Sequence, residues 1–171
     1  MKILKRRTIG GIAFVLIMGT LSHFLYEWTD KNFVAGLFTP VNESVWEHMK
    51  LVFFPMLLYS FFMIPGLKDE FPCLPSAYCF GMLLGTLLIP VLFYAYNFVT
   101  GRDVFFLDLA TFAVSVILGC TAVYKLTLHC GAKAFSWLLY VLAAMGIVCF
   151  MVFSYNPPPL AIFTPPSGSF S

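Results

Sequence analysis

Charged side chains are scarce in this sequence, which has 10 Lys and Arg and 8 Asp and Glu among its 171 residues. Soluble domains carry charge on about a quarter of their residues, so a charged fraction of 11% excludes an ordinary soluble globular domain. The net charge is only +2, and the one basic cluster is at the N-terminus. We therefore expect no nucleic-acid partner, because phosphate backbones are bound by many Lys and Arg side chains.

Motifs that would assign a reaction class are also missing. The sequence has no HExxH, no phosphate-binding loop and no hydrolase nucleophile signature. Its five cysteines form neither a CxxC pair nor a zinc-like spacing, so we predict ordinary buried or cytoplasmic thiols. They are Cys73, Cys79, Cys120, Cys130 and Cys149. Whether the protein is an enzyme therefore stays open.

Apolar residues dominate instead, at 60% of the chain, and the mean hydropathy is +0.89. They fall into five runs, each near the roughly 20 residues that a helix needs to cross about 30 Å of hydrocarbon. The runs lie at about 8–28, 44–65, 76–98, 104–126 and 134–154. Only helices satisfy their own backbone groups in segments of this length. We predict an all-α integral membrane protein, a single domain over 1–171 with a bundle of five transmembrane helices.

Lys and Arg are distributed unevenly between the two sides of this bundle, and that bias sets orientation. The side of the N-terminus has Lys2, Lys5, Arg6, Arg7, Lys68, Lys125 and Lys133, and the other side has Lys31, Lys50 and Arg102. We therefore predict a cytoplasmic N-terminus and a C-terminus outside. The Pro-rich tail, 155–171, cannot be helical and is expected to fold back over the outer mouth of the bundle.

One stretch, from Thr39 to Lys50, concentrates polar chemistry at the predicted outer side. Asn42 or Ser44 can cap the second helix, and the spacing from Ser44 to Glu47 fits a capping box, in which Glu47 bonds back to the cap's amide. Glu43, Glu47 and Lys50 would then share one helix face. The alternative is that this stretch has a purely structural role. It would then be a capped helix start in which Glu43 and Glu47 form salt bridges with Lys50.

The first and fourth helices bring further polar groups to the same level. His23 and Glu27 lie near the outer end of the first run, and Asp108 lies near the outer start of the fourth. Ionisable groups inside spans usually face the bundle interior and pair. The alternative to a shared site is an interhelical hydrogen bond between His23 and Asp108.

The mixture of imidazole and carboxylate suits a divalent ion such as zinc, manganese or iron, or a small cationic ligand. The candidate metal ligands are His23, Glu47, His48 and Asp108, with Glu47 also the candidate general base. The other candidate ligand-binding residues are Glu27, Asn42, Glu43, Lys50, Asn97 and Thr111.

Two further sequence features concern the shape and packing of the helices. Pro55 frees a carbonyl inside the second run and predicts a kink. The glycines of Gly81-x3-Gly85 allow close helix approach, which we expect to serve packing within the chain rather than dimerisation.

Several short motifs resemble those of a family of small bacterial multi-pass membrane proteins of unknown function. They are His23-x3-Glu27-Trp28, Pro40-Val-Asn-Glu-Ser-Val-Trp-Glu-His-Met-Lys-Leu51, the aromatic residues Phe93, Tyr94 and Tyr96, and Tyr155-x-Pro-Pro. The resemblance extends over the whole chain and implies a bacterial plasma-membrane setting and a shared five-helix plan. It carries no assigned activity.

Three functions follow as hypotheses. The first is an outward-facing His/Glu/Asp pocket that binds a divalent cation or a small cationic ligand, in connection with transport; five helices make a thin path, so transport would need a homo-oligomer or a membrane partner protein. The second is a metal-dependent enzyme acting on a lipid or lipid-linked substrate at the outer leaflet. The third is a non-catalytic scaffold in the lipid bilayer.

Overall fold

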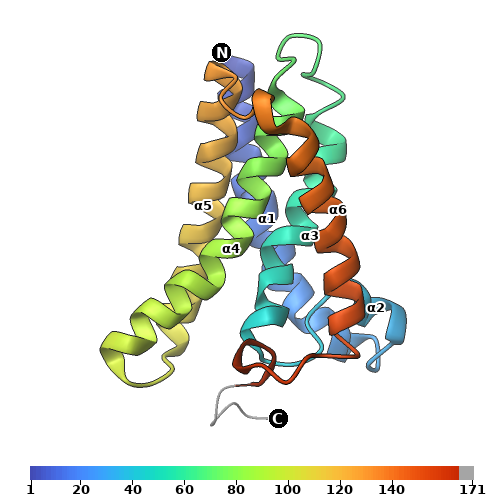
Figure 1. Cartoon of the computed structure of the whole chain (residues 1–171), viewed down its shortest axis with the longest axis vertical. Helices are drawn as coiled ribbons and strands as arrows, with labels where there is room; N and C mark the ends of the chain where they lie inside the picture. Colours follow the sequence, from blue (N-terminus) through green and yellow to red (C-terminus); the bar gives the residue numbers. More distant parts are fainter. Residues whose placement is uncertain (166–171) are drawn as a thin grey trace.

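The computed structural model describes residues 1–165, and these form helices and turns without a strand. The long helices stand side by side in a bundle (Figure 1). Their bounds, with those of the short helices, are α1 Lys2–Trp28, α2 Phe33–Phe38, α3 Val45–Met63, α4 Leu74–Thr100, α5 Phe105–His129, η1 Lys133–Phe135, α6 Ser136–Phe153 and η2 Ala161–Phe163. The expected all-helical architecture is confirmed.

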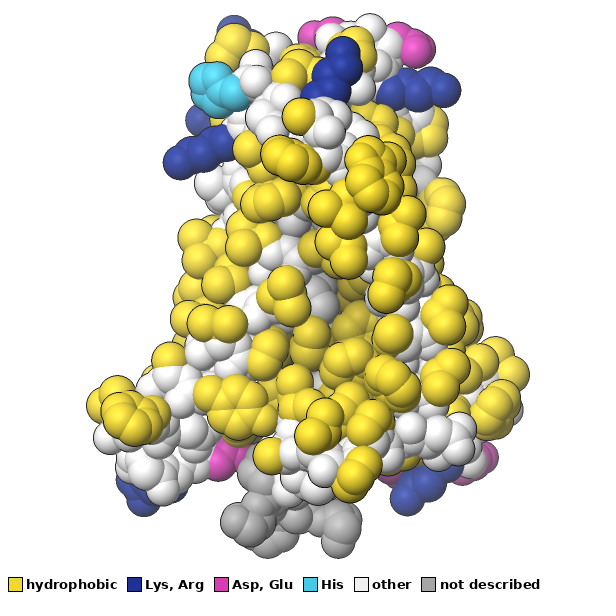
Figure 2. All heavy atoms as spheres, viewed as in Figure 1, with side chains coloured by type: hydrophobic (Ala, Val, Ile, Leu, Met, Phe, Trp, Pro, Cys, Tyr) yellow, Lys and Arg dark blue, Asp and Glu magenta, His cyan; other side chains and the backbone are white. Residues whose placement is uncertain are grey.

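Within residues 1–165, four segments are long and apolar enough to cross a membrane. They are Lys2–Trp28, Leu74–Thr100, Phe105–His129 and Lys133–Phe153. On the face drawn in Figure 2, apolar side chains cover the middle of the molecule and charged side chains gather at its two ends. This distribution is the one expected of a protein that spans a bilayer.

The second predicted span, 44–65, corresponds to α3 and is not among these four. Its helix has 19 residues, and Glu47, His48 and Lys50 all fall in its first turns. These polar groups shorten the apolar run, so the segment carries a weaker membrane signal than its neighbours.

Close contact between α4 and α5 depends on glycines at their crossing. A Cβ built on Gly119 would lie 2.7 Å from the carbonyl oxygen of Gly81 and 3.2 Å from the Cα of Gly85. No side chain fits between backbones this close, so only glycine permits the approach. The expectation that Gly81-x3-Gly85 serves packing within the chain is confirmed.

Cys73 and Cys130 form a disulfide that joins the start of α4 to the end of α5. The interpretation of all five cysteines as free thiols is therefore wrong for this pair. The two are separated by 57 residues, and no spacing rule pairs cysteines so far apart in a chain. The disulfide lies at the end of the bundle that holds the N-terminus (Figure 1).

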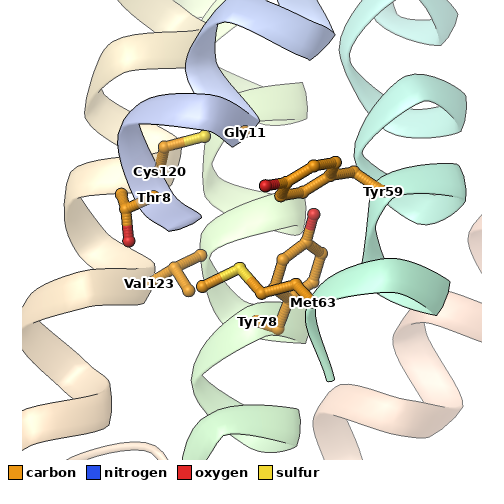
Figure 3. A pocket seen from close by; sticks show the side chains of 7 residues that line it. All are labelled: Thr8, Gly11, Tyr59, Met63, Tyr78, Cys120 and Val123. Carbon is orange, nitrogen blue, oxygen red and sulfur yellow. The ribbon is translucent and has the colours of Figure 1, made fainter. Parts of the chain in front are cut away.

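A small cavity lies between α1, α3, α4 and α5, and Figure 3 shows the side chains around it. Its volume is about 10 Å³, which is room for a single water at most. The two tyrosine hydroxyls beside it are already bonded: Tyr59 donates to the carbonyl oxygen of Arg7 and Tyr78 to that of Met56. This cavity is therefore a packing gap and not a ligand site.

The described part of the C-terminal tail folds back against the bundle, as the sequence predicts. The ring of Phe163 in η2 packs on Trp46 of α3, with 4.8 Å between ring centroids. The Tyr155 hydroxyl donates to the carbonyl oxygen of Phe33, 2.9 Å away. The tail thereby covers the start of α3 at the end opposite the N-terminus (Figure 1). The rest of the predicted tail, 166–171, lies outside the described residues.

Candidate functional site

The start of α3 is held by local hydrogen bonds that set where its polar residues point. The Ser44 hydroxyl accepts from the backbone N–H of Glu47, and the Asn42 amide oxygen accepts from the N–H of Ser44. Ser44 is therefore the cap, and Asn42 supports the turn before it. The Glu47 side chain accepts instead from the N–H of Val41, so the reciprocal half of the expected capping box is not formed.

Glu43 lies between two histidines that come from different helices. Its Oε2 atom is 3.5 Å from His23 Nε2 on α1 and 3.4 Å from His48 Nε2 on α3. One donor atom from each of the three residues lies within 4.8 Å of the other two. The three side chains, which we call the His–Glu–His cluster, are half-buried, so solutes can reach them.

The hydrogen bond of His48 fixes what its second nitrogen can do. Nδ1 lies 2.9 Å from the carbonyl oxygen of Ser44, and a carbonyl only accepts, so Nδ1 carries the proton. In neutral imidazole, Nε2 then presents a lone pair to the Glu43 carboxylate, which also accepts. Two acceptors that face each other at 3.4 Å repel, and a proton on His48 or Glu43 or a cation between them removes this repulsion.

Two of the three ligand-to-ligand distances in the cluster are close to those of a metal coordination shell. In a tetrahedral shell with bonds of about 2.0–2.1 Å, neighbouring ligand atoms lie about 3.3 Å apart. The two carboxylate-to-imidazole distances, 3.5 and 3.4 Å, are already close to that value. Metal-bound histidines also commonly donate their other N–H to a backbone carbonyl, as His48 does here.

Electrostatics favour the charged form of Glu43. In the metal-free protein, the hydrogen bond with His23 lowers the pKa of Glu43 below 4.5, against the opposing effect of burial, and each histidine adds to this lowering when it is protonated. The cluster therefore presents a carboxylate near neutral pH, which is the form that binds a metal.

Glu47 and Lys50 form a separate, fully buried ion pair. Lys50 Nζ lies 2.8 Å from Glu47 Oε2, and the two residues are 0% and 1% exposed. The other Glu47 oxygen accepts from the Ser154 hydroxyl. The expected salt bridge of Glu47 with Lys50 is formed, but Glu43 faces the histidines instead of Lys50.

Asp108 has a different neighbour from the one that the sequence suggests. The Tyr96 hydroxyl on α4 bonds to Asp108 on α5 and also to Asp103, 2.8 Å away in the connecting loop. His23 contacts Glu43 rather than Asp108. Charge links this group to the cluster: the charge of Asp103 acts on His48, and the charge of Glu43 acts on Asp108.

The remaining candidates make local contacts. Glu27 pairs with Lys31 one turn along the exposed end of α1, at 3.6 Å. Asn97 donates to the carbonyl oxygen of Phe93, and Thr111 is buried in α5. Neither of these two contacts involves a residue of the His–Glu–His cluster.

Glu43 was predicted from the sequence as a ligand-binding residue, but its position between the two histidines was not predicted. Tyr96, Asp103 and Ser154 were not among the predicted site residues. The sequence did contain one clue to the position of Glu43. Glu43 precedes the cap Ser44, so its side chain need not lie on the helix face that carries Glu47 and Lys50. Ser154 gave no signal, because its contact with Glu47 spans 107 residues.

Comparison with protein-family models gives a match over nearly the whole chain. A model of a family of unknown function, DUF6512, matches residues 1–168. No curated protein and no solved structure matches the chain.

Proposed function

Since the chain belongs to the DUF6512 family, whose function is unknown, we propose its function from the site: a membrane protein that binds a divalent transition-metal ion at the His–Glu–His cluster. The ligands are the Nε2 atoms of His23 and His48 and the carboxylate of Glu43. The observation that carries this proposal is the facing pair of acceptors, His48 Nε2 and Glu43 Oε2, which a bound cation would join.

The chemistry of the donors selects the class of metal. Two imidazoles with one carboxylate suit zinc, iron or manganese, whereas calcium and magnesium prefer all-oxygen sites. Magnesium also keeps several water ligands, which a half-buried pair of histidines does not favour. Zinc is therefore the first ion to test, with manganese and ferrous iron as competitors.

The proposal includes a topology. In it, α3 serves as a fifth span beside the four apolar segments, the N-terminus is cytoplasmic and the C-terminus is outside, in a bacterial plasma membrane. The Lys and Arg bias supports this orientation. The His–Glu–His cluster then lies at the outer surface of the bilayer, where a cation can reach it from the aqueous phase without crossing hydrocarbon.

Catalysis is the second candidate, favoured by the number of protein ligands. Three side chains leave a fourth coordination position open, as in catalytic zinc sites, where it holds the water that is activated. A site at the membrane surface would suit a lipid or lipid-linked substrate. Transport, the other role for such a site, would require a homo-oligomer or a partner protein to widen the path.

Direct metal measurement tests the proposal. We expect protein purified without chelator, or reloaded after EDTA treatment, to bind one zinc ion per chain, measured by elemental analysis and by titration with a zinc-sensing dye. His23→Ala, His48→Ala and Glu43→Gln should each lower the affinity by at least about tenfold, because each removes a ligand. His129→Ala is the matched control, since His129 ends α5 at the opposite end of the bundle. Wild-type protein without zinc affinity, or an equal loss in His129→Ala, would overturn the proposal.

A further inference from the structure

We propose that Glu47 and Lys50 are positioning residues for the His–Glu–His cluster: the buried pair fixes the chain segment that carries Glu43 against the helix that carries His48. This inference rests on the metal site proposed above. It gives the pair a role distinct from that of a ligand, because the three ammonium protons of Lys50 and both carboxylate oxygens of Glu47 already have hydrogen-bond partners.

The three protons of the Lys50 ammonium group are all used. Lys50 Nζ donates to Glu47 Oε2 at 2.8 Å, to the carbonyl oxygen of Gly36 at 2.8 Å and to that of Thr39 at 3.1 Å. Gly36 and Thr39 lie in the last turn of α2 and directly after it, where carbonyls lack partners within the helix. Lys50 therefore anchors the end of α2 to the first turns of α3.

The carboxylate of Glu47 holds the next part of the same segment. Its Oε2 atom accepts from the backbone N–H of Val41 at 2.9 Å, two residues before Glu43. Its Oε1 atom lies 2.9 Å from the hydroxyl of Ser154 at the end of α6, whose single proton is shared between Glu47 and the carbonyl oxygen of Phe150. Together the two charged groups bind 36–41 at three backbone atoms and tie this segment to α3 and α6.

His48 lies between the pair in the sequence and in the same turns of α3. The pair therefore sets the position of Glu43 relative to His48. Glu47 holds Val41, two residues before Glu43, and the backbone of α3 connects Glu47 directly to His48. An error of about 1 Å in that position would remove the 3.4 Å approach on which a shared ion depends.

Stability alone does not explain a buried ion pair. Removing two charges from water is unfavourable, and well-packed apolar replacements of similar size are often neutral or stabilising. Such replacements would, however, leave the Gly36 and Thr39 carbonyls and the Val41 N–H without partners, so the segment before Glu43 would lose its fixed position. This difference separates positioning from stability in an experiment.

The test uses the full chain in lipid nanodiscs and replaces the pair together, as Glu47→Leu with Lys50→Met, so that no lone charge is buried. We expect the double variant to bind zinc about 10- to 100-fold more weakly than wild type, the loss typical when the groups that orient metal ligands are removed. The absorption bands of bound Co²⁺ should also change, because they report ligand geometry. Tyr78→Phe is the control: it removes a buried hydrogen bond far from the cluster and should leave both readouts unchanged.

A second variant and a second measurement test the positioning role if the double variant fails to fold. If the double variant does not fold, Ser154→Ala takes its place; it removes one bond to Glu47 and should weaken zinc binding in the same direction by a smaller factor. Amide hydrogen exchange over 36–43, without metal, should be faster in either variant than in wild type.

The outcomes separate the two proposals. Wild-type zinc affinity and Co²⁺ spectra in the variants would overturn this inference and leave the metal site standing. Wild-type protein that binds no zinc would overturn the proposed function, and unchanged exchange over 36–43 would overturn the positioning role regardless of that result.

Discussion

Glu43 Oε2 and His48 Nε2 lie 3.4 Å apart across the cap of α3, one on the turn before the helix and the other inside its first turns. This relationship ties a loop residue to a helix residue through the geometry of Ser44, which caps α3 and also supplies the carbonyl that His48 contacts. A single polar turn therefore controls both the helix start and the candidate ligands. Predictions about Glu43 consequently concern stability as well as binding.

Glu43→Gln should lower stability in metal-free protein, and the difference should depend on pH. Because the pKa of Glu43 is lowered in the folded state, its carboxylate contributes stability that is present above the ordinary value of 4.5 and is lost as pH falls through the lower folded value. The difference in Tm between wild type and Glu43→Gln, measured with EDTA in an acid pH series, should therefore shrink below pH 4.5. A difference that stays constant through this range would contradict the pairing with His23.

Zinc should dissociate as the solution is acidified. Both histidines bind a metal only as neutral imidazole, and an unperturbed imidazole has a pKa of about 6.5. Zinc affinity should therefore be highest above that pH and fall steadily below it, measured by dye competition in a buffer series. A control titration of the dye alone gives its own pH dependence. Affinity that does not change across this range would exclude histidine ligands.

Gly119→Leu should weaken the packing of α4 against α5. A Cβ at this position already lies 2.7 Å from the carbonyl oxygen of Gly81, and overpacking of a tight interface typically destabilises by about 1–3 kcal/mol. Thermal unfolding in detergent should show a clear fall in Tm. The matched control is Gly66→Ala, where an added Cβ has nothing nearer than 3.8 Å and the effect should be small. Equal effects of the two substitutions would contradict a close α4–α5 contact.

Local signals in the sequence predicted the helices and the cap. Four of the five apolar runs correspond to α1, α4, α5 and α6, and the remaining run corresponds to α3, because a segment in lipid must satisfy its own backbone groups as a helix. Ser44 was recognisable as a cap because a capping interaction involves residues only three apart. The folded-back tail followed from its prolines and its apolar side chains.

Contacts over long separations could not be predicted in this way. Helical spacing placed Glu43 and Glu47 on one face, but Glu43 precedes the cap, so its direction depends on a turn and not on the helix period. The partners of Glu47 include Ser154 on α6, and Cys73 pairs with Cys130 on another loop. Such pairs depend on how the helices pack against one another, and short-range sequence patterns do not predict that packing.

The redox state of Cys73 and Cys130 in living cells should report the orientation of the bundle. The pair lies at the end that holds the N-terminus and most Lys and Arg residues, so a cytoplasmic N-terminus places it in a reducing compartment. The disulfide of the structure and the Lys and Arg bias therefore point to opposite orientations. Under the proposed topology, the pair should be reduced to a dithiol in cells whose thiols have been trapped rapidly with a permeant maleimide, and the disulfide should form only after extraction in air.

The opposite result is expected if the N-terminus lies outside the cell. In that case the disulfide persists in the cell, because disulfides form and remain in oxidising compartments. Cys79, Cys120 and Cys149 are free and should be replaced by Ala, so that the mass of the trapped protein counts only the pair. Lys31→Cys, on the exposed turn after α1, is the control in a chain without other cysteines: an impermeant maleimide added to intact cells should label it if the N-terminus is cytoplasmic. A persistent disulfide together with an unlabelled Lys31→Cys would place the His–Glu–His cluster on the cytoplasmic side, where it would meet the cell's own metal pool instead of ions from outside.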